Sequence, residues 1–86
     1  MKFRWSKEKN DWLKSLGWKN GRSSFEDCVD AIKNNLIDEL EHETHPLRGY
    51  FIVQIKGKLV RVVYEKTEND NELVLITNYV DGSLKG

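Results

Sequence analysis

The chain has 86 residues, of which 33% are charged, and its 14 basic residues balance its 14 acidic ones. This composition is too charged for a membrane protein and too aliphatic for a disordered chain, so we expect one globular domain over residues 1–86. A net charge of zero gives no overall attraction for nucleic acid, so a phosphate-binding role would need a local patch. The single cysteine excludes an internal disulfide, and the lack of an apolar run after the N-terminal charges predicts a cytoplasmic protein.

The N-terminal half predicts a strand followed by two helices. Residues 2–5 alternate in hydrophobicity and read as a short strand. Ser6 is placed to cap a first helix, and Gly17 provides the left-handed residue that ends it. A capping box, in which Ser23 pairs with Glu26, begins the second helix.

The apolar residues of this half are expected to form the core. Cys28 lies on the apolar face of the second helix and should be an inert buried thiol. Core packing explains Trp5, Trp12 and Trp18 better than stacking on nucleobases does. Residues 36–41 are ambiguous, because their local propensity favours a helix while a short strand is also possible.

The last third of the chain predicts three strands, over residues 50–55, 59–65 and 73–79. A two-residue turn at residues 56–57 sets the pairing of the first two strands, and directly opposite residues share a face. One face is expected to face the core and to carry Phe51, Val53, Ile55, Val60, Val62 and Tyr64. The other is expected to be open and to carry Tyr50, Ile52, Gln54, Leu59, Arg61, Val63 and Glu65.

The predicted order of elements is β-α-α-β-β-β-β. The two helices precede the antiparallel strands, and a sandwich of two layers places both of them on one face of the sheet. We therefore expect an α+β fold in which two N-terminal helices pack on one face of a small antiparallel sheet.

Arg61 interrupts the most apolar of these strands. Because a guanidinium is always charged and is rarely buried without a partner, the face that carries Arg61 should be open or should hold an anion. Glu65 lies on the same face and could act as a base or could neutralise Arg61. The alternative is a surface arginine whose aliphatic stem covers its apolar neighbours.

Several motifs occur along the chain in an order that resembles the BrnT-like toxins, compact members of the RelE-type ribonuclease superfamily. They are Phe3-x-Trp5 with Lys9, Ser24-Phe25-Glu26-Asp27 with Ala31-Ile32, His45-Pro46, and Thr77-x-Tyr79. The resemblance implies a strand at residues 36–41 and a RelE-like fold. It also implies a ribonuclease toxin whose substrate is RNA and whose partner is a protein antitoxin. The antitoxin would itself bind DNA through a ribbon-helix-helix-like fold.

Cleavage of RNA by attack of its own 2′-hydroxyl needs a base, an acid and cations that stabilise the phosphorane, but no metal or cofactor. The candidate catalytic residues are Arg61, Arg48, Glu65 and Tyr79. The candidate RNA-binding residues are Tyr50, Gln54 and Lys85. The pair His42-x-x-His45 has metal-ligand spacing, but Pro46 disfavours a helix there and a third ligand is not evident, so no metal site is expected.

The chain departs from the toxin pattern after its last strand. The family usually continues there with a proline and a basic cluster, whereas residues 80–83 read Val-Asp-Gly-Ser. This difference favours an alternative function, in which the chain is a catalytically degenerate binding module that pairs with an antitoxin-like protein. A domain of unrelated function with the same topology is a third possibility. The acidic segment of residues 38–43 could receive a basic partner segment or could be a solvated face.

Overall fold

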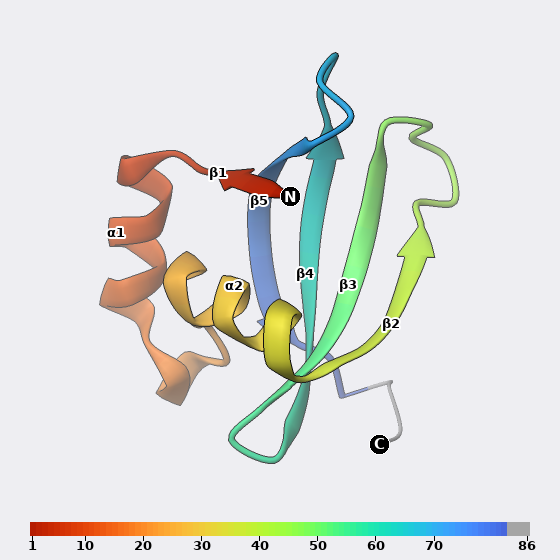
Figure 1. Cartoon of the computed structure of the whole chain (residues 1–86). Coiled ribbons are helices and arrows are strands. Elements are labelled where there is room, and N and C mark those ends of the chain that lie inside the picture. The colour runs from red at the N-terminus through yellow and green to blue at the C-terminus, as the bar shows by residue number, and fades with distance from the viewer. Residues whose placement is uncertain (83–86) are drawn as a thin grey trace.

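A computed structural model describes residues 1–82 and has the element order β-α-α-β-β-β-β, as predicted. The fold is α+β, with two helices on one face of a five-stranded sheet (Figure 1). The elements are β1 (Lys2–Arg4), α1 (Lys7–Leu16), a 3₁₀ turn η1 (Trp18–Asn20), α2 (Phe25–Asn34), β2 (Leu36–Glu41), β3 (Arg48–Ile55), β4 (Lys58–Lys66) and β5 (Glu72–Val80). Residues 36–41 therefore form a strand, which decides between the two readings of this segment.

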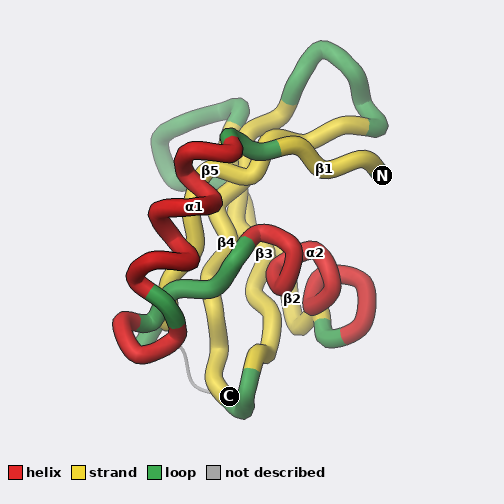
Figure 2. The backbone as a smooth tube through the Cα atoms, turned by 90° about the vertical axis from the view of Figure 1, so that its left-hand side faces the viewer, coloured by secondary structure: helices red, strands yellow, loops and turns green. Residues whose placement is uncertain are grey.

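The strands lie in the order β1-β5-β4-β3-β2. The four strands from β2 to β5 are antiparallel to their neighbours, whereas β1 pairs in parallel with β5. Both helices lie on the same side of the sheet, and a view from that side shows them in front of the strands (Figure 2). Within residues 1–82, the structure contains no helix of the length and apolarity that a membrane span requires.

The hairpin of β3 and β4 has the predicted register, in which Ile55 pairs with Lys58 and Phe51 pairs with Val62. Lys56 and Gly57 form its two-residue turn with φ values of 51° and 78°. Positive φ at both central positions is the feature of a type I′ turn, whose twist matches that of paired strands. The turn thus directs alternate side chains to the two faces as the sequence predicts.

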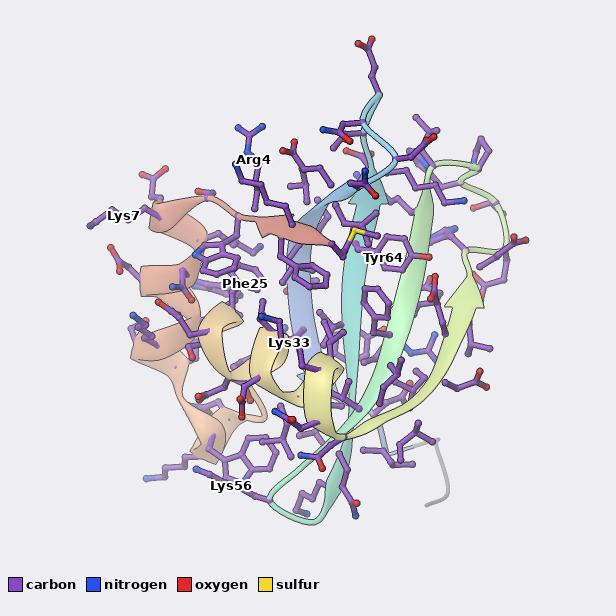
Figure 3. The ribbon with its side chains drawn as sticks, in the orientation of Figure 1. Arg4, Lys7, Phe25, Lys33, Lys56 and Tyr64 are labelled. Atoms are coloured by element: carbon purple, nitrogen blue, oxygen red, sulfur yellow. The ribbon has the colours of Figure 1, made fainter. Side chains whose placement is uncertain are left out.

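The main core fills the layer between the helices and the sheet. The second helix contributes Phe25, Cys28 and Ala31 to this layer, and Figure 3 shows Phe25 inside it. Burial raises the pKa of the Cys28 thiol to about 12, and the charge of Asp27 acts in the same direction. Cys28 is therefore buried and protonated, as expected.

Two buried asparagines hold the start of α2 from opposite sides. Asn10 in α1 accepts a hydrogen bond from the Phe25 N–H at 2.8 Å and donates one to Glu26 at 2.8 Å. Asn78 in β5 accepts from the Ser23 N–H at 2.9 Å and donates to the Ser23 carbonyl at 2.8 Å. These contacts tie the first helix, the second helix and the last strand together.

The capping of α2 corrects the predicted capping box. The N-cap is Ser24, whose hydroxyl accepts from the Asp27 N–H at 3.1 Å, one residue later than expected. Ser23 is buried instead, because its main chain is bonded to Asn78. The Glu26 carboxylate accepts a hydrogen bond from Asn10 rather than pairing with Ser23, and this hydrogen bond lowers the pKa of the carboxyl.

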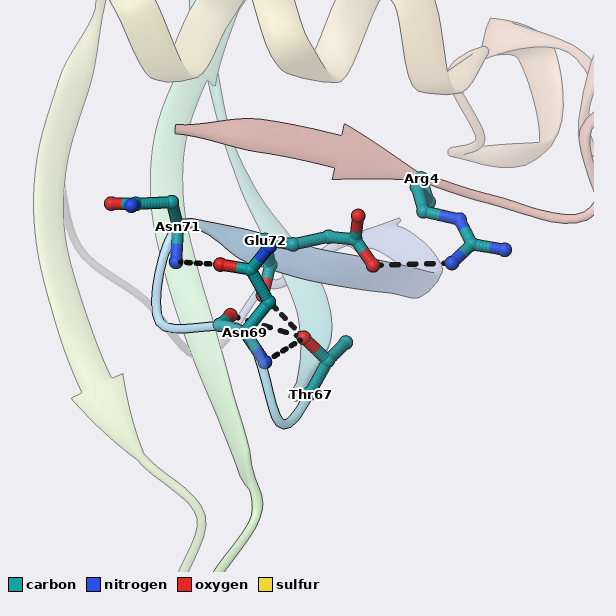
Figure 4. Close-up of polar contacts among 5 residues, drawn as sticks. All are labelled: Arg4, Thr67, Asn69, Asn71 and Glu72. Atoms are coloured by element: carbon teal, nitrogen blue, oxygen red, sulfur yellow. Dashed lines mark hydrogen bonds and ion pairs between the residues drawn. The ribbon is translucent and has the colours of Figure 1, made fainter.

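The first and last strands are joined at one end of the sheet. Arg4 in β1 donates a hydrogen bond to Glu72 in β5 at 3.1 Å. In the loop before β5, the Thr67 hydroxyl forms hydrogen bonds with main-chain groups of Asn69 and Glu72 (Figure 4). Asn69 also accepts from the Asn71 N–H at 2.9 Å. This loop therefore has a defined shape, although its residues are largely polar.

Candidate functional site

The face of the sheet that carries no helix has a small apolar cluster of its own. Tyr50, Ile52 and Val63 are buried there, and Leu59, Ile76 and Tyr79 pack around them. All six belong to strands β3, β4 and β5. The prediction of an apolar and polar mixture on this face is confirmed, and its aliphatic residues Ile52 and Val63 are buried within the cluster. We call this surface the open face.

Arg61 lies in the middle of the open face, as predicted, and has two close partners. Its Nε atom lies 3.0 Å from Oδ2 of Asp81, and the two side chains are 16% and 14% exposed. Its guanidinium carbon lies 4.5 Å from the centre of the Tyr50 ring. Nε has no acceptor in a good hydrogen-bonding direction, so the contact with Asp81 is an ion pair. The neutralising carboxylate is thus Asp81, which follows β5, and not Glu65.

Glu65 instead belongs to a second cluster, at the end of the β3–β4 hairpin that lies opposite its turn. Arg48 donates from Nε to Oε1 of Glu65 at 3.3 Å, and Nε2 of His45 lies 3.9 Å from the same oxygen. The three side chains are 34–41% exposed. Nδ1 of His45 is buried and has no hydrogen-bond partner among residues 1–82. This cluster brings a cation, a carboxylate and an imidazole to one place at the surface.

Sequence reasoning missed the role of Arg22, which precedes α2 and reaches the open face. Its Nη1 donates to the Asn78 carbonyl at 2.7 Å, which holds the guanidinium beside β5. From there the guanidinium carbon lies 5.9 Å from the Tyr79 ring and 5.5 Å from the Trp12 ring. Position 22 carries no local signal for this role, because both aromatic partners are distant in the sequence.

Trp12 also corrects an expectation, because it is 44% exposed and does not belong to the core. The amino group of Lys9, one turn earlier in α1, lies 4.7 Å from its ring. Trp5 and Trp18 do pack against the core, as expected. Trp12 therefore lies between two cations at the edge of the sheet.

These residues form a series of cations and aromatic rings that leads from α1 across the open face. Tyr79 connects the two halves of the series, because it is directly opposite Arg61 in the pairing of β4 with β5. We call the series the aromatic–cation row and define it as Lys9, Trp12, Arg22, Tyr79, Arg61 and Tyr50.

Tyr50 ends the row as a neutral hydrogen-bond donor. Its hydroxyl donates to Glu43 at 3.4 Å, and burial, followed by the charge of Glu43, raises its pKa. The ring of His42 stacks against Tyr50 at 5.5 Å. Nδ1 of His42 accepts from the N–H groups of Thr44 and His45 at 3.1 and 3.0 Å, so His42 organises the loop. Within residues 1–82, no group of three His, Cys, Asp or Glu side chains is placed to hold a metal ion.

Gln54, another of the predicted residues, lies away from these clusters. Gln54 is exposed at the turn end of β3, where it lines a hollow of about 440 Å³ together with Leu59, Val80 and Asp81. The hollow adjoins the carboxylate that pairs with Arg61. Lys85 lies outside the described residues.

Comparison with known proteins returned no matching family model, no matching curated protein and no matching solved structure.

Proposed function

We propose that the chain binds single-stranded RNA on its open face and cleaves it without a metal ion, as the toxin of a cytoplasmic toxin–antitoxin pair. The observation that carries the proposal is the aromatic–cation row. Surfaces that bind single-stranded nucleic acid combine aromatic rings, on which bases stack, with cations that follow the phosphates. Stacking of this kind tolerates any base, so the proposal implies little sequence preference at Trp12 and Tyr79.

Within this proposal, cleavage takes place at the cluster of Arg48, Glu65 and His45. Glu65 or His45 removes the proton of a 2′-hydroxyl, whose oxygen attacks the adjacent phosphorus. The bond from phosphorus to the 5′-oxygen breaks, and that oxygen receives a proton from the other member of the pair. The products are a 2′,3′-cyclic phosphate and a 5′-hydroxyl. Arg48 stabilises the charge on the phosphorane, and Arg61 holds a neighbouring phosphate.

A second candidate function is a non-catalytic module with the same fold that pairs with an antitoxin-like protein. The ion pair of Arg61 with Asp81 favours it, because a carboxylate occupies the position where a phosphate would have to bind. The contact of Arg48 with Glu65 also favours this function, because a carboxylate is already paired with that arginine. In this reading the aromatic–cation contacts simply stabilise the sheet, as such contacts do in many proteins.

Removal of the Asp81 charge separates the two functions. The purified chain, Asp81→Asn and Arg61→Ala are incubated with a fluorescent single-stranded RNA, and both binding and the cyclic-phosphate product are measured. If the open face binds RNA, Asp81→Asn should bind about tenfold more tightly than the parent, because one opposing charge at short range is removed. Arg61→Ala should bind more weakly than both.

The matched control is Asp70→Asn, which removes an exposed carboxylate from the loop between β4 and β5. This variant should behave as the parent does. Circular dichroism establishes that every variant is folded. If the parent and Asp81→Asn both fail to bind and cleave RNA, the ribonuclease proposal is wrong. Growth arrest on expression in bacteria that requires Arg61 supports the enzyme, whereas harmless expression at high yield supports the module.

A further inference from the structure

Strand β2 forms one edge of the sheet, and its outer side is unpaired among the described residues (Figure 1). Every residue of β2 is exposed, including three aliphatic ones. Leu36 is 46% exposed, Ile37 58% and Leu40 38%. An edge strand with exposed aliphatic side chains is a template for a further strand from another chain.

The outward backbone groups of this edge can be assigned from the pairing with β3. The His42 N–H donates to the Arg48 carbonyl at 3.1 Å, and antiparallel strands alternate between hydrogen-bonded and free positions. Leu40 therefore bonds inward to β3, whereas the N–H and C=O groups of Glu39 and Glu41 face away from the sheet. These groups are the ones that a sixth strand would bond.

The charge of the edge indicates what kind of strand it would accept. Residues 34–47 contain Asp38, Glu39, Glu41 and Glu43 but no lysine or arginine. Glu39 accepts from the Tyr64 hydroxyl at 2.8 Å, which fixes one of these carboxylates on the helix side of the sheet. The edge is thus locally acidic in a chain whose net charge is zero.

The two faces of β2 differ in character. Asp38 and Leu40 are opposite Ile52 and Tyr50, and so lie on the open face. Glu39 and Glu41 lie on the helix side. A second copy of this chain, paired antiparallel through the same edge, would bring these acidic residues close to one another, and like charges across a strand pair are unfavourable. The bulge between Leu36 and Asp38 further restricts the registers that a second copy could use.

We propose that β2 binds an extended cationic segment of a different protein, which adds to the sheet as a sixth strand. Lysine or arginine side chains at alternate positions of that segment face Glu39 and Glu41. The intervening β-branched side chains lie beside Leu40 and extend the apolar cluster of the open face. The interaction does not involve Arg61 or Asp81, so it stands whether or not the chain binds RNA.

The test uses the full chain and an eight-residue peptide in which lysine and valine alternate. Titration followed by NMR should shift the amides of β2, and exchange with solvent should slow for the amides of Glu39 and Glu41. A peptide in which glutamate replaces lysine is the control for charge. It should bind at least tenfold more weakly, because it meets the acidic edge with like charge.

Two variants at one position separate charge from backbone pairing. Glu41→Gln removes a carboxylate and should weaken binding of the lysine peptide about threefold to tenfold. Glu41→Pro also removes the outward N–H, and proline is tolerated on a strand edge that faces solvent, so this variant should fold but lose binding altogether. Glu8→Gln removes an exposed carboxylate from α1, which lies on the other side of the molecule from β2 (Figure 1), and this variant should bind as the parent does.

Three results would overturn the inference. One is equal binding of the glutamate peptide, and another is equal binding by Glu41→Gln and Glu41→Pro. The third is sedimentation of the chain alone as a dimer that Glu41→Pro dissociates, because β2 would then be occupied by a second copy. None of these results bears on RNA binding, which is measured separately through Arg61 and Asp81.

Discussion

Replacement of Asn78 by alanine should destabilise the fold more than any change on the open face. The Asn78 side chain is fully buried and forms two hydrogen bonds with the main chain of Ser23, which is itself buried. Alanine would leave the Ser23 N–H and C=O without partners, in a place that water does not reach. The variant also leaves a small void beside β5.

The size of the effect follows from those two groups. A buried polar group that loses its partner costs about 1–3 kcal/mol, so two of them cost about 4 kcal/mol. In a domain of 86 residues, each kcal/mol lowers Tm by about 4–8 °C. Asn78→Ala should therefore lower Tm by about 16–32 °C, a change that removes a large part of the stability of a small domain.

Urea and thermal unfolding followed by circular dichroism measure this loss. The matched control is Asn20→Ala, because Asn20 also donates to a main-chain carbonyl, that of Leu16 at 2.7 Å, but lies at the surface. Water replaces that hydrogen bond, so the control should lose less than about 1 kcal/mol. Equal losses for the two variants would refute the reasoning, since the large expected loss depends on the burial of the two Ser23 groups.

Three further predictions concern single positions. A Cβ atom at Gly49 would lie 2.5 Å from Cζ of Tyr64 and 2.9 Å from the Leu40 carbonyl oxygen, so Gly49→Ala should cost about 3 kcal/mol in urea unfolding. Cys28, whose pKa is raised to about 12 by burial, should resist alkylation at pH 8 in the folded chain and react in urea. Burial and the bond to Glu39 raise the pKa of Tyr64 from 10 to about 12. The contribution of Tyr64 to the free energy of unfolding is therefore complete below pH 10. It is lost as the pH rises to 12, because the tyrosine of the unfolded chain ionises at a lower pH than that of the folded chain. Between pH 10 and 12, the Tm of Tyr64→Phe should fall less than that of the parent.

The parts of the fold that local rules govern could be predicted from the sequence. The register of β3 and β4 follows from the two-residue turn at Lys56 and Gly57, and the register in turn divides the side chains between the two faces. The helix stop at Gly17 is equally local, because a φ of 67° combined with a ψ of 178° suits glycine alone. Each of these inferences needed only neighbours in the sequence.

The features that the sequence did not reveal depend on residues far apart. Asn78 and Ser23 are 55 positions apart, so the buried pair has no local pattern, and the displaced cap at Ser24 is its consequence. Asp81 and Arg61 are 20 positions apart, and their ion pair forms only because β5 pairs with β4 in the sheet. Trp12 shares the apolar spacing of Leu13 and Leu16 in its helix, yet its side chain is 44% exposed, and the spacing alone does not show which of these residues meet the sheet.

The pairing of β1 with β5 has a consequence for biosynthesis. The parallel register sets Lys2 against Glu72, so β1 is synthesised before the other strands of the sheet but completes its ladder only when β5 has emerged from the ribosome. Until then β1 has no strand to pair with, and the start of α2 lacks its hydrogen bonds with Asn78. A nascent chain of this topology should therefore remain open to chaperones or to a partner until β5 has been synthesised, and should acquire this fold only then.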